Sequence, residues 1–185
     1  KAVPIYQTAS YVLENTEEAA KIFSADKFGF TYSRIANPTV AVFEKRMALL
    51  EKGIDATAFA SGTAAVIGSI LNITQSGDEI LAAKNLYGGT YTLLNNTLKQ
   101  YGIKTTFFDG HRLEELKSLI NENIKLVFLE SIGNPNADIV PLKEIAEMAH
   151  SFGIPVIVDN TFGTPYLFNA FSFGADIVVH SATKF

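Results

Sequence analysis

Cysteine is absent from this sequence of 185 residues. The protein can therefore form neither a disulfide nor a thiolate metal site, which fits a reducing compartment, and we expect it in the cytoplasm. Runs rich in lysine or arginine are missing and the formal net charge is -4, so we expect no binding to nucleic acid or to an anionic membrane. No apolar run approaches the roughly 20 residues of a membrane span, and the opening "KAVP" lacks the apolar core of a signal peptide.

Apolar residues make up 48% of the chain and charged residues 18%, which is typical of a globular protein with a sizeable core. From about residue 56, short apolar runs alternate with helical patterns. This alternation predicts an α/β fold with a mostly parallel sheet flanked by helices. We expect six strands, at residues 56–60, 79–83, 104–108, 125–129, 155–158 and 176–179. We expect helices near residues 63–73, 87–101, 111–122 and 142–152.

Residues 1–55 follow a different pattern, an extended stretch and then two helices. Asn15 or Thr16 is expected to cap the first helix. In the second helix Asn37 can cap, and Pro38 fits the first helical position. An apolar stripe follows on this helix, formed by Val42, Phe43, Met47 and Leu50. This part of the chain is therefore predicted to be an arm rather than a separate domain.

Two of the expected strands lead directly into side chains that can carry chemistry. Asp159 ends the run "VIVD", and Ser181, Thr183 and Lys184 follow the next run in "HSATK". A lone strand-end aspartate is often a generic capping or ribose-binding acid, and a lone lysine is usually exposed to solvent. Because the two strands are consecutive, adjacent parallel positions would bring the carboxylate, the amine and two hydroxyls into one cleft.

A third candidate is the turn Ser61-Gly62-Thr63 between an expected strand and an expected helix. Its free N–H groups and the positive end of the helix can bind an anion, and Gly62 lets a phosphate approach the backbone closely. A plain N-cap with close helix packing explains the same residues equally well. Tyr87 in "NLYGGTY" can offer its ring face to a planar ligand, although a buried aromatic is the commoner explanation.

A phosphate site, an aromatic ring, a carboxylate and an amine are together what pyridoxal 5′-phosphate requires. The amine condenses with the cofactor aldehyde, and an aspartate facing the ring nitrogen keeps the ring protonated so that it can accept electrons. Six motifs occur in order over nearly the whole chain: "YSRIANPT", "ASGTAA", "LYGGTY", "ESIGNP", "VDNTFGTPYL" and "GADIVVHSATKF". In these motifs the chain resembles the Cys/Met-metabolism family of pyridoxal-phosphate enzymes.

The resemblance implies part of the large domain of a fold type I enzyme, similar to that of aspartate aminotransferase. It implies that Lys184 carries the cofactor and moves protons, and that Asp159 pairs with the ring nitrogen. Tyr87 would stack on the ring and assist at the γ-leaving group. Asn134 would lie near the phenolic oxygen of the ring. The residues implied at the phosphate are Ser61, Gly62, Thr63, Ser181 and Thr183.

The resemblance also implies an assembly. In the family a Tyr-x-Arg pair reaches the cofactor phosphate of a neighbouring subunit, and here that pair is Tyr32 and Arg34. Taken alone, these two residues would be read as exposed loop residues. The implied organisation is a homo-oligomer, a dimer of dimers, with residues 1–55 as an arm that contacts a neighbouring subunit and 56–185 as a partial cofactor-binding domain.

Family members continue beyond the cofactor lysine into a smaller C-terminal domain, which supplies an arginine for the substrate carboxylate. We therefore expect this chain to be part of a longer protein. The arm and "FGFTYSRIANPT" most resemble O-acetylhomoserine sulfhydrylases, in which sulfide replaces a γ-acetoxy group to give homocysteine for methionine biosynthesis. Methionine γ-lyases usually carry cysteine where this chain has Gly89, which counts against a lyase. Cystathionine γ-synthase and γ-lyase remain open, and each of these enzymes acts on a small amino acid.

Two other classes of function are considered. A dinucleotide-binding oxidoreductase needs a Gly-x-Gly-x-x-Gly turn, and no such string occurs. A truncated, non-catalytic oligomerisation module remains open. The histidines at 111, 150 and 180 are not spaced with other ligands as metal sites require, so we expect no metal. Glu130 at the end of "KLVFLE" is expected to make structural hydrogen bonds.

Overall fold

The computed structural model describes residues 2–185, and its contacts divide the chain into two compact units. The first unit comprises the chain up to Leu49 together with Gly53–Ala58. The second, the sheet unit, comprises Leu50–Lys52 and Phe59–Phe185. This division falls close to the predicted boundary at residue 55, while the role of the arm stays a prediction.

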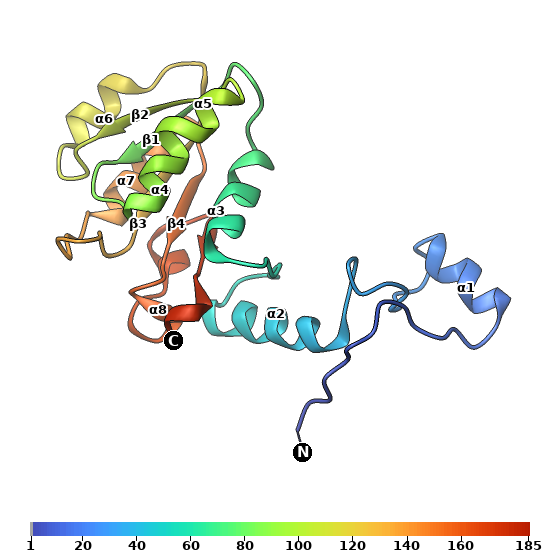
Figure 1. The fold of residues 1–185 in the computed structure, drawn as a ribbon. Coiled ribbons are helices and arrows are strands. Elements are labelled where there is room, and N and C mark those ends of the chain that lie inside the picture. The colour runs from blue at the N-terminus through green and yellow to red at the C-terminus, as the bar shows by residue number, and fades with distance from the viewer. Residues whose placement is uncertain (1) are drawn as a thin grey trace. The chain divides into compact units, whose positions relative to one another are not determined.

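The sheet unit contains five parallel strands in the order β2-β1-β3-β4-β5 (Figure 1). Their bounds are β1 Glu79–Ala83, β2 Lys104–Phe108, β3 Ile124–Glu130, β4 Val156–Asp159 and β5 Ile177–Val179. The predicted parallel α/β fold is confirmed, and five of the six predicted strands are found within one residue at either end. Because all five strands run the same way, their carboxyl ends meet at one edge of the sheet.

The predicted strand at residues 56–60 is wrong. These residues pair with no strand in the described part of the chain, and the Ala58 N–H donates instead to the Glu44 carboxylate at 2.8 Å. A strand needs a neighbour for its N–H and C=O groups, and an apolar composition cannot supply one. Residues 56–60 thus have the apolar composition of a strand but lack a partner strand to pair with among residues 2–185.

Helices follow the strands as expected for right-handed crossovers. In the sheet unit the longer ones are α3 Gly62–Leu71, α6 Leu113–Leu119 and α7 Leu142–Ser151. The helix expected near 87–101 consists of α4 Gly88–Thr92, a π-helical turn at Leu93–Thr97 and α5 Leu98–Gln100. Three short helices were not predicted: α8 Thr164–Leu167 and 3-10 turns at Ala170–Phe173 and Ala182–Lys184.

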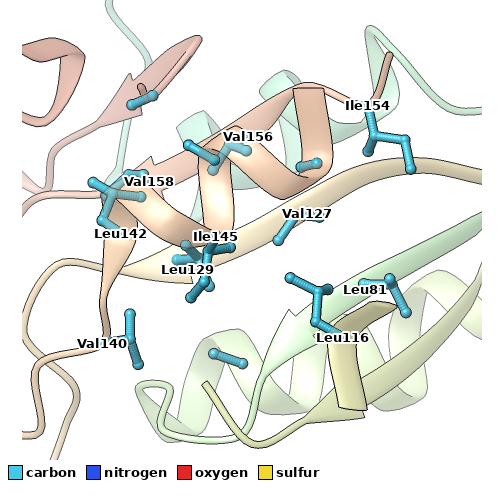
Figure 2. Close-up of a cluster of buried hydrophobic side chains, with 14 of the residues drawn as sticks. Leu81, Leu116, Val127, Leu129, Val140, Leu142, Ile145, Ile154, Val156 and Val158 are labelled. Atoms are coloured by element: carbon cyan, nitrogen blue, oxygen red, sulfur yellow. The ribbon is translucent and has the colours of Figure 1, made fainter. Parts of the chain in front are cut away.

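Both faces of the sheet are covered by apolar side chains. Along β1, Leu81 and Ala83 belong to one buried cluster, whereas Ile80 and Ala82 belong to the other. Figure 2 shows the first cluster, which includes Leu81, Leu116, Val127, Leu129, Ile145, Val156 and Val158. The second cluster includes Val66, Ile70, Leu94, Leu98 and Phe128, mostly from α3 and from the helical segment between β1 and β2. Burial on both faces explains why the inner strands β1, β3 and β4 are almost continuously apolar in sequence.

The first unit contains α1 Thr16–Phe23 and most of α2 Pro38–Glu51. Asn15, not Thr16, caps α1 by accepting the Glu18 N–H at 2.8 Å. The predicted cap at Asn37 is confirmed, because its side-chain oxygen accepts the Thr39 N–H at 2.9 Å. None of the helices formed by residues 2–185 is long and apolar enough to span a bilayer.

Candidate active site

Carboxylates end two neighbouring strands at the carboxyl edge of the sheet. Glu130 is the last residue of β3 and Asp159 the last residue of β4, and the two are direct partners in the strand register. Asp159 is also in register with Val179, which ends β5 and precedes the "HSATK" segment by one position in the chain. The sheet thus brings Asp159 beside the segment that leads to Lys184.

Asp159 is held by the hydroxyl and the main chain of Thr161. The Thr161 N–H donates to the Asp159 carboxylate at 3.0 Å and the Thr161 hydroxyl donates to the same oxygen at 2.5 Å. Burial raises the pKa of Asp159, and the two Thr161 hydrogen bonds and the charge of His180 act in the opposite direction. A cation placed opposite this carboxylate would favour its ionised form.

Thr161 also connects Asp159 to the segment after β5. Its hydroxyl oxygen accepts the Ser181 N–H at 2.9 Å. Sequence reasoning missed this residue, although an Asp followed two positions later by Thr is a pattern known for local hydrogen bonds of this kind. Through Thr161, the ends of β4 and β5 form one connected group.

The turn at Ser61 lies against the same segment. Ser61 caps α3 by accepting the Ala64 N–H at 3.1 Å, while a helix start leaves its first N–H groups without intrahelical partners. A Cβ atom built on Gly62 would lie 2.6 Å from Ser181 Cβ, so only glycine fits this approach. The Ser181 hydroxyl lies 3.1 Å from the Thr183 hydroxyl. The structure therefore gathers Ser61, Gly62, Thr63, Ser181 and Thr183.

Glu130 contacts the start of α4. Its carboxylate accepts the Tyr87 N–H at 2.7 Å, which agrees with the structural hydrogen bonding expected for this residue. Burial raises the pKa of Glu130 to about 7, and the nearby Asp159 charge adds to the rise, whereas the N–H groups of Tyr87 and Asn134 counteract it. These contacts place Tyr87 and Asn134 at the end of β3. Tyr87 is 54% exposed as a residue, so it is not the buried aromatic of the commoner explanation.

Lys184 forms no ion pair within residues 2–185. Lys184 ends the last 3-10 turn and is exposed. Tyr32 and Arg34 belong to the first unit, where the guanidinium carbon lies 5.2 Å from the centroid of the tyrosine ring. That they reach a neighbouring subunit stays a prediction.

Metal-binding side chains do not cluster in the described chain, where no group of three histidine, aspartate or glutamate residues could hold an ion. His111 pairs with Asp138 at 2.7 Å and His150 with Asp176 at 2.8 Å. His180 pairs with the buried Glu51. Sequence reasoning missed Glu51, since 129 positions separate it from His180.

A sequence model of the Cys/Met metabolism PLP-dependent enzymes matches residues 1–185. The chain belongs to this family. It is 45% identical to the O-acetyl-L-homoserine sulfhydrylase of Leptospira meyeri, over 100% of this chain and 42% of that protein. It is 40% identical to an L-methionine gamma-lyase of Fusobacterium nucleatum, over 100% of this chain and 47% of that protein.

Among solved structures, the chain is similar to one described as an O-acetylhomoserine (thiol)-lyase from Campylobacter jejuni. The TM-score is 0.94 at 40% identity, over 98% of this chain and 45% of that one. That structure carries an N′-pyridoxyl-lysine-5′-monophosphate. The chain thus spans less than half the length of these members of the family.

Proposed function

We propose that the full-length protein replaces the acetoxy group of O-acetyl-L-homoserine with sulfide, giving L-homocysteine and acetate. The observation that carries the proposal is the connected group at the strand ends, in which Thr161 bonds both Asp159 and Ser181, and Ser181 touches Gly62. Membership of the family and the 45% identity to an O-acetyl-L-homoserine sulfhydrylase support it.

The connected group fits pyridoxal 5′-phosphate. Unpaired N–H groups at the start of α3 and the hydroxyls of Ser181 and Thr183 suit a phosphate, because the positive end of a helix attracts an anion. Asp159 suits the ring nitrogen at the other end of the cofactor, and Tyr87 has an exposed ring that suits stacking on the pyridine face. When bound, the protonated cofactor withdraws electrons from the substrate carbon atoms.

The residues of this chain would then divide the work. Asp159 would keep the ring nitrogen protonated, and Thr161 favours the ionised carboxylate and orients it, because it donates two hydrogen bonds to it. Lys184 would hold the cofactor covalently, and its amine would move protons between substrate carbons. Asn134, whose N–H contacts Glu130 at the end of β3, would lie near the phenolic oxygen of the ring.

Gly89 favours the sulfhydrylase over the lyase reaction. A Cβ atom at position 89 would lie 2.5 Å from the Tyr87 ring, so a larger residue there would push the ring from its present place. With glycine, Tyr87 keeps its ring beside position 89 at the start of α4, where it would assist at the γ carbon. The substitution expected in methionine γ-lyases would therefore change the residue that contacts the leaving group.

An assembly is part of the proposal. Large apolar side chains of the first unit are exposed, among them Ile5, Val12, Phe23, Phe28 and Ile35. Exposed apolar side chains in such number are typical of surfaces that a partner covers. A second copy of the protein, joined as a dimer of dimers, would cover them and accept Tyr32 and Arg34 at its cofactor phosphate. We further propose that the enzyme acts in the cytoplasm.

Product analysis tests the proposal. The full-length protein is supplied with O-acetyl-L-homoserine and sulfide, with methionine, or with cystathionine. Homocysteine formed only from the first pair supports the sulfhydrylase. Methanethiol and 2-oxobutanoate from methionine would assign a γ-lyase instead. A protein without visible cofactor absorption or turnover would be the non-catalytic oligomerisation module.

A further inference from the structure

The buried carboxylate of Glu51 contacts the residues that directly follow β4 and β5. The Glu51 side chain is only 5% exposed, and its Oε1 pairs with Nε2 of His180, whose side chain is 8% exposed. Oε1 also accepts the Asn160 side-chain amide at 3.0 Å, and Oε2 accepts the Asn169 amide at 3.2 Å. Three side chains from more than 100 positions away therefore converge on one acid.

The hydrogen bonds fit an ionised Glu51. An ionised carboxylate only accepts hydrogen bonds, and here three donors face its two oxygens. With Nε2 of His180 as a donor, the acid and the ring form a charge-assisted pair inside the protein. A buried charge is tolerated only with partners of this kind, so the donors and the acid depend on one another.

The donors are neighbours of the proposed cofactor residues. Asn160 follows Asp159 directly in the chain, and His180 directly precedes Ser181. Asn160 also donates to the Phe168 carbonyl at 2.7 Å, which ties the segment after β4 to the following loop. Glu51 thus bonds the side chains of the residues next to Asp159 and Ser181, of which the first would contact the ring nitrogen and the second the phosphate.

The polar cluster around Glu51 is not an arrangement that maximises the stability of the folded protein. Two of its buried atoms, Asn160 Oδ1 and His180 Nδ1, have no hydrogen-bond partner among residues 2–185. An unpaired buried polar atom destabilises a protein, and well-packed apolar residues in place of a buried ion pair are often at least as stable. These polar side chains are better explained by a role in positioning the neighbouring residues Asp159 and Ser181 than by a contribution to stability.

We propose that Glu51 is a positioning residue of the cofactor site, acting through Asn160 and His180 on the segments that carry Asp159 and Ser181. The proposal rests on the proposed function, since it assigns Glu51 to the same site. Without Glu51, these two segments lose their common anchor. Cofactor affinity then falls because the carboxylate and the phosphate donors no longer keep the spacing that one ligand requires.

The test uses the full-length protein with Glu51→Gln and Asn169→Ala. Glutamine keeps the size of Glu51 but leaves one acceptor, and Asn169→Ala removes one donor while leaving Glu51 paired. Ile145→Ala, on α7 in the first buried cluster, is the control for lost stability because Ile145 makes none of the hydrogen bonds of Glu51. The measurements are cofactor titration of the apoprotein, the visible absorption and circular dichroism of the bound cofactor, and hydrogen exchange of the 181–183 amides in the apoprotein.

We expect Glu51→Gln to weaken cofactor binding by at least about tenfold and to change the visible spectrum. Faster exchange of the 181–183 amides should accompany this, and Asn169→Ala should show smaller changes in the same direction. Ile145→Ala should lower thermal stability with an unchanged spectrum. Equal binding, spectrum and exchange in Glu51→Gln and wild type would overturn the inference, as would equal changes in Ile145→Ala. If wild type binds no cofactor, the proposed function fails, and amide exchange alone decides the role of Glu51.

Discussion

The two units of the chain differ in how completely they bury apolar side chains. In the sheet unit, Phe108 and Phe128 are 1% and 0% exposed, whereas Val12 and Phe28 of the first unit are 99% and 76% exposed. Among the described residues of the first unit, Ala48 is the one buried apolar residue. Because apolar burial is the main source of folding free energy, the sheet unit has a core of its own and the first unit does not. The exposed apolar side chains of the first unit support the proposed subunit interface.

The two units also differ in proposed role, because Lys184 and Asp159 of the proposed active site belong to the sheet unit. The largest effect on activity is expected from Lys184→Ala. Loss of the covalent attachment and of the proton-moving amine should lower kcat/KM by at least about 10³-fold. Steady-state kinetics of the full-length protein, with light scattering to verify an unchanged assembly, give the measurement. Activity within tenfold of wild type would remove Lys184 from the mechanism.

The core of the sheet unit is tested by Leu129→Ala. Leu129 is 1% exposed in the cluster between β3 and α7, and the cavity left behind should lower the free energy of unfolding by about 2–5 kcal/mol. Urea denaturation followed by circular dichroism measures the change. A loss below about 1 kcal/mol would mean that this cluster is less tightly packed than the structure shows.

Glu130 makes the stability of the sheet unit depend on pH. Its pKa is about 7 in the folded protein, against an ordinary value of 4.5, so between these values the folded state binds more protons than the unfolded state. The free energy of unfolding therefore falls as pH rises through this range, by at most about 3 kcal/mol at about 1.4 kcal/mol per pH unit. Glu130→Gln cannot titrate and should remove this contribution. Denaturation of the apoprotein at about pH 5 and about pH 8 measures it, and an equal pH dependence in both proteins would contradict the assignment.

The smallest effect on unfolding is expected in the first unit. Phe28→Ser should change the denaturation of the sheet unit by less than about 0.5 kcal/mol, because the side chain is already exposed. The same change should weaken the assembly, which light scattering over a dilution series detects. Unchanged mass at every concentration would show that Phe28 lies outside the interface, and the exposed Ile5 then offers a second variant for the same test.

Sequence reasoning located the strands well for a physical reason. The inner strands β1, β3 and β4 are buried on both faces, so each is a nearly continuous apolar run, whereas the edge strands β2 and β5 are only partly buried. Residues 56–60 have the same composition but no partner strand, and pairing is not encoded in a single run. The π-helical turn at Leu93–Thr97 could not be predicted from the sequence either, because it changes the hydrogen bonds of a helix without changing its apolar pattern.

Some residues of the candidate site could likewise be predicted from the sequence, and others could not. Asp159 and Ser181 stand at the ends of consecutive predicted strands, so the order of strands was enough to expect them together. Gly62 was grouped with them only through the cofactor and the family resemblance, because the strand predicted before it does not form. Glu51 had no such signal, because its partners lie more than 100 positions away and only folding brings them to it. Residues that end strands can be predicted from one sequence, whereas the residues that hold them in place depend on long-range packing.

The most direct test is reduction of the full-length protein with borohydride, followed by proteolysis and mass spectrometry. Reduction makes the bond between a lysine and its cofactor permanent. The account predicts one modified peptide, with the pyridoxyl phosphate group on Lys184. Modification of a different lysine, or of none in protein reconstituted with the cofactor, would contradict it.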